Sequence, residues 1–201
     1  MLKATGHPLL ARYLDLAMSP LKAVRARLIP LAKGRVLEVG GGTGANLEWY
    51  RDLDSLVVVE PDPHMRVRAE RRARKQGVPT QILDADAALL PFPDASFDTV
   101  VATFVLCTIP EVDAAIREMR RVLKPDGCLL YAEHTRSEGR VVHAAQRALT
   151  PMWRRVAGGC RLDRDSLRWL RETGFDLQPM SPPRPANHPF PVHYGVARPR
   201  S

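Results

Sequence analysis

Short runs of consecutive apolar residues alternate along this chain with longer segments in which apolar residues recur at helical spacing. A short uninterrupted apolar run is typical of a strand that is buried on both faces, as in a parallel sheet covered by helices. Such runs predict strands at residues 35–39, 55–60, 80–83, 97–104, 128–133, 175–180 and 192–197. Because strands separated by helices imply right-handed crossovers, the pattern predicts an α/β fold with a largely parallel sheet.

The segments between these runs predict helices with recognisable start and stop residues. They lie at residues 9–17, 21–32, 45–53, 63–76, 111–123, 141–156 and 163–173. Pro20 can begin the second helix, Gly77 and Gly174 can end two others, and Pro151 is expected to interrupt the helix at 141–156. Residues 125–127, Pro-Asp-Gly, predict a turn, and the proline-rich residues 181–191 predict a loop.

A turn crowded with glycine follows the first predicted strand. Residues 36–44 read Val-Leu-Glu-Val-Gly-Gly-Gly-Thr-Gly, and Glu60 closes the next apolar run. Glycine is needed where the backbone takes φ > 0 or where a ligand approaches closely. A carboxylate at the end of the next strand can accept hydrogen bonds from both hydroxyls of a ribose. The arrangement therefore predicts an adenosine-type cofactor across the carboxyl ends of a parallel sheet.

Two cofactor patterns overlap in this turn. Gly40, Gly42 and Ala45 satisfy the dinucleotide spacing G-x-G-x-x-G/A, and Glu60 follows at the distance that this pattern asks. Gly40, Gly42 and Gly44, preceded by Glu38, fit the loop of S-adenosylmethionine enzymes instead. A carboxylate would repel a pyrophosphate, whereas the methionine end of S-adenosylmethionine carries an ammonium and a sulfonium. Glu38 thus favours the methyl donor, and a nicotinamide-dependent oxidoreductase is the alternative from a different class.

Two downstream segments extend the pattern. Residues 84–98 read DADAALLPFPDASFD, and residues 121–127 read RVLKPDG. In order and spacing, these segments, the glycine turn and Glu60 resemble the class I S-adenosylmethionine-dependent methyltransferases from residue 36 to about residue 134. The resemblance implies a Rossmann-like, seven-stranded, mostly parallel sheet with helices on both faces and an antiparallel last strand. It also implies S-adenosyl-L-methionine as the cofactor and S-adenosyl-L-homocysteine as the product.

The same resemblance implies a set of cofactor-binding residues. In it, Glu38 lies under the methionine moiety and Glu60 takes the ribose hydroxyls. Asp86 accepts from the adenine amino group, although Asp84 could fill that role if the register shifts. The complete expected set is Glu38, Gly40, Gly41, Gly42, Gly44, Glu60, Pro61, Asp86, Ala87, Thr103, Phe104 and Val105.

The acceptor side offers fewer candidates. His134 follows Glu133 at the carboxyl end of the fifth predicted strand, which faces the cofactor mouth. An imidazole with an unperturbed pKa near 6.5 could orient a nucleophile or take its proton, although capping a loop would explain His134 equally well. His188 and His193 are further candidates, while Cys107 is more typical of a small core residue.

Segments in both halves of the chain resemble the animal methyltransferase-like alkyl-thiol methyltransferases. They include TFVLCTI at 103–109, GGCRLDRDS at 158–166 and PVHYGVA at 191–197. Those proteins carry a hydrophobic N-terminal anchor, which is not expected here, and a cysteine where this chain has Gly41. The resemblance implies a small apolar thiol as the acceptor. An amine or phospholipid head group, a quinone-like ring carbon and a non-catalytic cofactor-binding subunit are the alternatives.

Composition fits one domain over residues 1–201. We expect a helical cap at 1–33, a cofactor-binding core at 34–134 and acceptor-side helices and strands at 135–201. No apolar stretch approaches the ~20 residues that span a bilayer, and the first residues lack a secretory signal. Cys107, Cys128 and Cys160 are few and odd in number, which favours reduced thiols and a cytoplasmic location. Histidines and cysteines are too scattered for a structural zinc site, so no metal is expected.

The net charge of +8 needs a separate interpretation. Six basic residues crowd the predicted helix at 63–76, namely Arg66, Arg68, Arg71, Arg72, Arg74 and Lys75. Without aromatic interleaving or a nucleic-acid module, we expect this to be a solvated helix face and expect no nucleic-acid partner. Peripheral membrane contact stays open, and the sequence does not indicate an oligomeric state.

Overall fold

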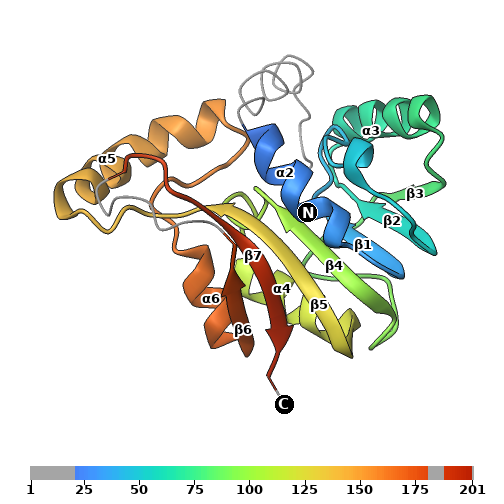
Figure 1. Ribbon diagram of the computed structural model, residues 1–201. Coiled ribbons are helices and arrows are strands. Elements are labelled where there is room, and N and C mark those ends of the chain that lie inside the picture. Colours follow the sequence, from blue (N-terminus) through green and yellow to red (C-terminus); the bar gives the residue numbers. More distant parts are fainter. Residues whose placement is uncertain (1–20, 181–187, 201) are drawn as a thin grey trace.

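The apolar runs of the sequence form the strands of one sheet (Figure 1). The computed structural model describes residues 21–180 and 188–200, so the predicted helix at 9–17, Pro20 and most of the predicted loop at 181–191 lie outside the described residues. The strands are β1 (Arg35–Val39), β2 (Ser55–Val59), β3 (Thr80–Leu83), β4 (Phe97–Thr103), β5 (Leu123–His134), β6 (Phe175–Pro179) and β7 (Val192–Pro199).

The strand order is β3-β2-β1-β4-β5-β7-β6. Neighbouring strands are parallel except that β7 runs antiparallel to both β5 and β6. This confirms the expected seven-stranded, mostly parallel Rossmann-like sheet. Val39 of β1 pairs with Val59 of β2 and with Ala102 of β4, and Thr103 pairs with Ala132 of β5. The carboxyl ends of these strands therefore meet at one edge, where ligands bind in sheets of this kind.

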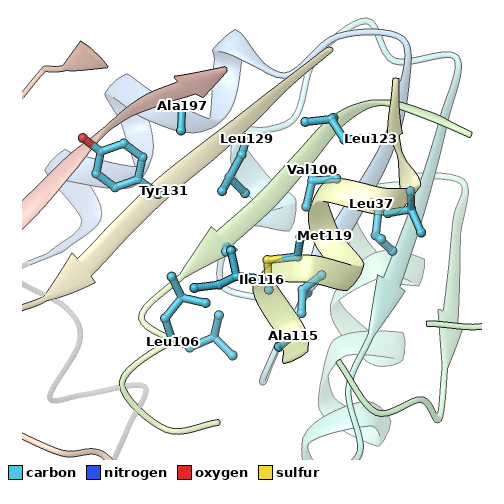
Figure 2. Close-up of a cluster of buried hydrophobic side chains, with 14 of the residues drawn as sticks. Leu37, Val100, Leu106, Ala115, Ile116, Met119, Leu123, Leu129, Tyr131 and Ala197 are labelled. Atoms are coloured by element: carbon cyan, nitrogen blue, oxygen red, sulfur yellow. The ribbon is translucent and has the colours of Figure 1, made fainter. Parts of the chain in front are cut away.

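Helices cover both faces of the sheet (Figure 1). They are α2 (Lys22–Leu28), α3 (Pro63–Gln76), α4 (Val112–Val122), α5 (Arg140–Val156) and α6 (Ser166–Glu172), with short 3-10 helices η2 (Ile29–Leu31) and η3 (Leu47–Trp49). On one face, Ile116 and Met119 of α4 pack with Leu37, Val100 and Leu129 of the sheet (Figure 2). On the other face, Leu28, Leu47 and Ala73 contribute to a second core. The sheet is thus buried on both faces, as its apolar strands predict.

Three details of the sequence-based prediction are wrong. The helix at 45–53 is only the three residues of η3, because Gly44 takes φ +80° and Tyr50 is extended with ψ 140°. The turn at 125–127 is a bulge within β5, where pairing passes from Phe97↔Leu123 to Thr99↔Cys128. Pro151 does not interrupt α5, where the neighbouring Thr150 hydroxyl donates to the Gln146 carbonyl.

Within residues 21–180 and 188–200, no helix combines the length and apolarity that crossing a membrane requires. In the same ranges, histidine, cysteine, aspartate and glutamate side chains do not form a group of three or more that could hold a metal ion.

Candidate active site

The glycine loop leaves β1 at the carboxyl edge of the sheet. Gly40 takes φ +68°, and a Cβ atom there would collide with the side chain of Val105. Gly42 takes φ +55°, and a Cβ atom built on it would meet nothing within 4 Å. Gly42 therefore presents bare backbone to open space, as close approach of a ligand requires. Gly41 and Gly44 complete the loop, with the Gly44 amide donating to the Gly41 carbonyl at 2.9 Å.

Glu60 is bound to this loop from the end of β2. Its Oε2 accepts the Gly42 amide and its Oε1 accepts the Asp62 amide, both at 2.9 Å. The side chain is buried, and burial raises the pKa of its carboxyl above the usual range. Each carboxylate oxygen has two lone pairs, so both oxygens can still accept one hydroxyl. Pro61 stands beside it and is exposed, while Asp62 caps α3 by accepting the His64 and Met65 amides.

Glu38 lies at the centre of a buried polar network beneath the loop. Its Oε1 accepts the Asn46 amide at 2.8 Å, and its Oε2 accepts the Tyr50 hydroxyl at 2.9 Å. Asn46 also donates to the Thr103 hydroxyl at 2.9 Å and accepts from Arg25 Nε at 3.0 Å. Burial raises the pKa of Glu38 to about 7, although hydrogen bonds from Tyr50 and Asn46 oppose the shift. Near neutral pH, a cation bound next to Glu38 can therefore convert its carboxyl from the protonated to the ionised form.

The end of β4 forms another wall of the site. Thr103 ends the strand, and Phe104 takes φ +56°, an uncommon conformation for a bulky residue. The Glu133 carboxylate fastens the following loop, because its Oε1 accepts the Val105 and Leu106 amides at 2.9 Å and its Oε2 accepts the Cys107 amide at 3.3 Å. Glu133 is fully buried, and burial raises its pKa to about 8.

His134 ends β5 beside this loop. The centroid of its ring lies 5.2 Å from the centroid of the Phe104 ring. The Arg25 guanidinium carbon also lies 5.2 Å from the centroid of the Phe104 ring. The structure thus brings His134 together with the residues expected at the methionine side of the cofactor. His188 makes a local contact instead, because its Nδ1 accepts the Phe190 amide two residues along the chain. His193 pairs with Glu133 in the register of β5 and β7.

The expected adenine residues follow β3. Asp84 is exposed and forms an ion pair with Arg66 at 2.9 Å. Asp86 is exposed, and its Oδ1 accepts the Ala88 amide at 2.9 Å in a turn. Ala87, in the same turn, packs against the core on the α4 face. Both acids are exposed at the end of β3, and Asp86 remains the adenine residue that the sequence predicts.

Two arginines of the basic helix α3 support the site. Arg66 Nη1 donates to the carbonyls of Glu60 and Pro61, each at 2.8 Å. Arg72 Nη1 donates to the carbonyl and the hydroxyl of Thr43, at 3.3 and 3.1 Å. Part of the basic run thus holds the loops of the site in place and does not form an independent anion-binding face.

Four residues of the site have no role in the sequence-based prediction: Arg25, Asn46, Tyr50 and Glu133, of which only Glu133 was placed at the cofactor mouth. Asn46 and Tyr50 are nearly fully buried despite their polar groups, and both bond to Glu38. Their position shortly after the glycine loop could have indicated a role in the site. Polar groups buried there need hydrogen-bond partners, and Glu38 offers two acceptor oxygens. Glu133 sat in an otherwise apolar strand, which is the signal that a carboxylate there must be matched by donors.

The donor set fits S-adenosylmethionine better than a dinucleotide. The buried carboxylate of Glu60 accepts the Gly42 amide of the glycine loop, and the buried carboxylate of Glu38 lies on β1, two residues before the loop. Carboxylates suit hydroxyls and an ammonium. A pyrophosphate would need the N-terminus of a helix directly after the loop, and η3 has only three residues. Glu60 can hold the ribose and Glu38 can face the amino acid end, so the residues fit the methyl donor.

Known proteins share this architecture. A family model described as a methyltransferase domain matches residues 37–131. Thiol S-methyltransferase TMT1A of Homo sapiens is 30% identical over 175 residues, covering 84% of this chain and 72% of the relative. Phosphatidylethanolamine N-methyltransferase of Cereibacter sphaeroides is 34% identical over 118 residues, 58% of either chain. Ubiquinone/menaquinone biosynthesis C-methyltransferase UbiE of Pseudomonas putida is 35% identical, covering 69% of this chain and 57% of the relative.

The chain spans less than two thirds of the length of several relatives, among them TMT1B of Rattus norvegicus, of which it covers 59%. Among solved structures, the cyclase SpnF has a TM-score of 0.70 at 25% identity, over 92% of this chain and 82% of that one. A putative S-adenosyl-L-methionine-dependent methyltransferase of Methanococcus maripaludis has a TM-score of 0.64 at 16% identity, over 95% and 92%, which is a likeness of fold alone. By its fold, its glycine loop with a carboxylate on either side and these matches, the chain belongs to the class I S-adenosylmethionine-dependent methyltransferases.

Proposed function

We propose that this chain transfers a methyl group from S-adenosylmethionine to a small acceptor, and that the acceptor is a thiol. The observation that carries the proposal is the pair of buried carboxylates on either side of the glycine loop: Glu60, which accepts the Gly42 amide, and Glu38, which precedes the loop on β1. When bound, the cofactor supplies a methyl group on a sulfonium for in-line displacement. Holding the reactants at near-attack distance can contribute about 7–11 kcal/mol to lowering the barrier.

The residues of the chain have distinct parts in this proposal. Glu60 holds the ribose, and Glu38 stabilises the positive amino acid end. Phe104 and Val105 form the wall that excludes water on the methionine side, and Glu133 fastens Val105 by accepting its amide. An imidazole nitrogen of His134, beside Phe104, takes the proton of the acceptor. A thiol with a pKa of about 8.5 is only a few per cent thiolate at pH 7, so a base of this kind raises the reactive fraction.

The similarity to TMT1A supports the thiol among possible acceptors. That match covers 175 residues and cannot fit within residues 1–131, so it includes part of the acceptor half. The N-methyltransferase and C-methyltransferase relatives support two rival acceptors, an amine or phospholipid head group and a quinone-like ring carbon. A non-catalytic cofactor-binding subunit is the candidate from a different class, and a nicotinamide oxidoreductase is disfavoured by the missing pyrophosphate anchor.

Release of S-adenosylhomocysteine with a panel of acceptors tests this function. The panel consists of small apolar thiols, amines, phenols or quinols, and phospholipid vesicles. Turnover with thiols alone is the expected result. Turnover with another class and none with thiols would replace the thiol proposal. Cofactor binding without turnover across the panel would favour the non-catalytic subunit, and calorimetric binding of a nicotinamide dinucleotide would favour the oxidoreductase.

His134→Ala should lower turnover with an alkyl thiol by about 100-fold at pH 7, a typical loss for a general base. The loss should shrink as the pH rises or as the thiol becomes more acidic, because a preformed thiolate needs no base. Cofactor affinity should stay nearly unchanged. His64→Ala, at an exposed histidine of α3, is the matched control. Turnover at the wild-type level in the His134→Ala variant would contradict the role of His134 as a base and leave it a packing residue.

Cofactor affinity should depend on pH through Glu38. Its pKa is about 7 in the free protein, so about half of the molecules carry a protonated carboxyl at neutral pH. The ammonium of the ligand's amino acid end, placed beside Glu38, favours the carboxylate and lowers this pKa, so binding releases a proton and tightens as pH rises. We expect S-adenosylhomocysteine affinity to increase up to tenfold per pH unit below pH 7 and to level off above it. Titration calorimetry should show this slope.

Two controls isolate Glu38 as the source. Glu38→Gln should remove most of the slope, since the amide does not titrate. Adenosine, which lacks the amino acid end, should bind the wild-type protein with little dependence on pH between 6 and 8. An unchanged slope in the Glu38→Gln variant would assign the titration to another group.

A further inference from the structure

Two of the three cysteines meet at the boundary between the cofactor half and the acceptor half of the chain. The Sγ atoms of Cys107 and Cys160 lie 3.5 Å apart, although 53 positions separate the residues in sequence. Ala157 is buried in the same cluster, and Trp153 packs against it. Cys128 lies elsewhere, on β5, and packs against the core on the α2 face. The proposed methyl transfer uses none of these thiols.

The two segments that carry the thiol pair are already fastened to each other. The Cys107 carbonyl accepts the Arg161 amide at 3.0 Å, next to Cys160 in the chain. Arg164, which is buried, donates from Nη1 to the Leu106 carbonyl at 2.7 Å. A disulfide needs an S–S distance of about 2.05 Å, so the sulfurs must approach by only about 1.5 Å. Small side-chain rotations can supply this distance between segments held so closely.

We propose that Cys107 and Cys160 form a reversible disulfide that links the loop after β4 to the segment between α5 and α6. Cys160 is the more accessible of the pair, at 9% exposure against 1% for Cys107. The hydrogen bond between the two sulfurs is the largest cause of the lowered pKa of Cys160 and of the raised pKa of Cys107. Cys160 is therefore the attacking thiolate, and Cys107 resolves the intermediate.

The oxidation balances with a peroxide as the oxidant. The Cys160 thiolate attacks one oxygen of hydrogen peroxide, and the O–O bond breaks to leave a sulfenic acid and, after protonation, one water. The Cys107 sulfur then attacks the Cys160 sulfur, the S–O bond breaks, and a second water leaves with the Cys107 proton. Two thiols and one peroxide thus give one disulfide and two waters.

The link would join parts with different tasks. Cys107 belongs to the same loop as Phe104 and Val105, which Glu133 fastens beside the expected methionine site. Cys160 belongs to the acceptor half. A covalent bond between them limits movement of the acceptor half relative to the cofactor loop. It also closes a long loop in the unfolded chain, which raises the stability of the folded state.

Hydrogen peroxide treatment of the folded full-length chain tests this proposal. Before alkylation, the oxidised wild-type protein should be about 2 Da lighter than the reduced protein. After denaturation and alkylation, it should have one alkylated cysteine, Cys128, where the reduced protein has three. Its melting temperature should rise by about 5–10 °C, and dithiothreitol should reverse both changes. Hydrogen exchange at the amides of Leu106, Cys107 and Arg161 should become slower.

Single variants identify the pair. Cys128→Ser should behave like the wild-type protein, whereas Cys107→Ser and Cys160→Ser should show neither the mass loss nor the rise in melting temperature. Three alkylated cysteines in the treated wild-type protein would overturn the proposal. A disulfide that persists in the Cys160→Ser variant would do so too, as would an oxidised form that melts at or below the reduced one.

Discussion

Replacing Glu60 with alanine should weaken binding of S-adenosylhomocysteine by about 100-fold or more. Two hydrogen bonds from ribose hydroxyls to a carboxylate are worth about 3 kcal/mol together, which is roughly a hundredfold in Kd. The carboxylate also accepts the Gly42 and Asp62 amides at 2.9 Å, so its loss leaves the glycine loop less fixed. Titration calorimetry on the folded variant measures the effect directly.

Two further variants separate the ribose contact from the support of the loop. Glu60→Gln keeps an oxygen for the Gly42 amide but loses the charge. Its affinity for S-adenosylhomocysteine should therefore lie between those of the wild-type and alanine proteins. Glu48→Ala, at an exposed acid of η3, should bind normally. Unchanged affinity in the Glu60→Ala variant would end the assignment of Glu60 to the ribose.

Replacing Glu133 with alanine should have the largest effect on stability. The variant leaves three buried amides, those of Val105, Leu106 and Cys107, without the acceptor that binds them now. Each buried unsatisfied amide costs about 1–3 kcal/mol, so the free energy of unfolding should fall by about 3 kcal/mol or more. For a chain of this size the melting temperature should fall by about 6–12 °C.

The glutamine variant provides a sharp control for Glu133. Oε1 accepts two of the three amides, so an isosteric amide oxygen in that place can keep the bonds from Val105 and Leu106. The free energy of unfolding should therefore fall in Glu133→Gln by only about a third of its fall in Glu133→Ala. If calorimetry finds the two variants equally unstable, the charge of Glu133 matters more than its capacity to accept hydrogen bonds.

The sheet was predictable because its signals are local. Each strand is a short apolar run, and glycine and proline mark many boundaries, as at Gly77, which takes φ +65° and ends α3. The helix at 45–53 was a wrong prediction because its apolar spacing did not reveal that Asn46 and Tyr50 turn inward to Glu38. Residues 125–127 are turn formers by composition, yet opposite Asp98 they form a bulge that lets the strand continue.

In the candidate site, the sequence predicts single residues placed by motif spacing but not the hydrogen-bond networks between residues far apart in the chain. The placement of Glu60 beside the glycine loop follows from spacing alone, and the structure places its carboxylate on the Gly42 amide. The networks around Glu38 and Glu133 join residues that are up to 57 positions apart, and composition does not indicate such partners. In a strand buried on both faces, periodicity does not tell which face a carboxylate takes, so the direction of Glu133 could not be inferred.

The position of β7 has a consequence for how the chain is made. β7 (Val192–Pro199) leaves the ribosome after both β5 and β6, yet it lies between them in the sheet. Until it arrives, the buried apolar edge of β5 has no neighbour on that side, and β6 has no sheet to join. An unpaired apolar edge is a template for association with other chains. Synthesis that stops before residue 192 should therefore yield nascent chains that depend on chaperones, even though the whole cofactor loop has already been made.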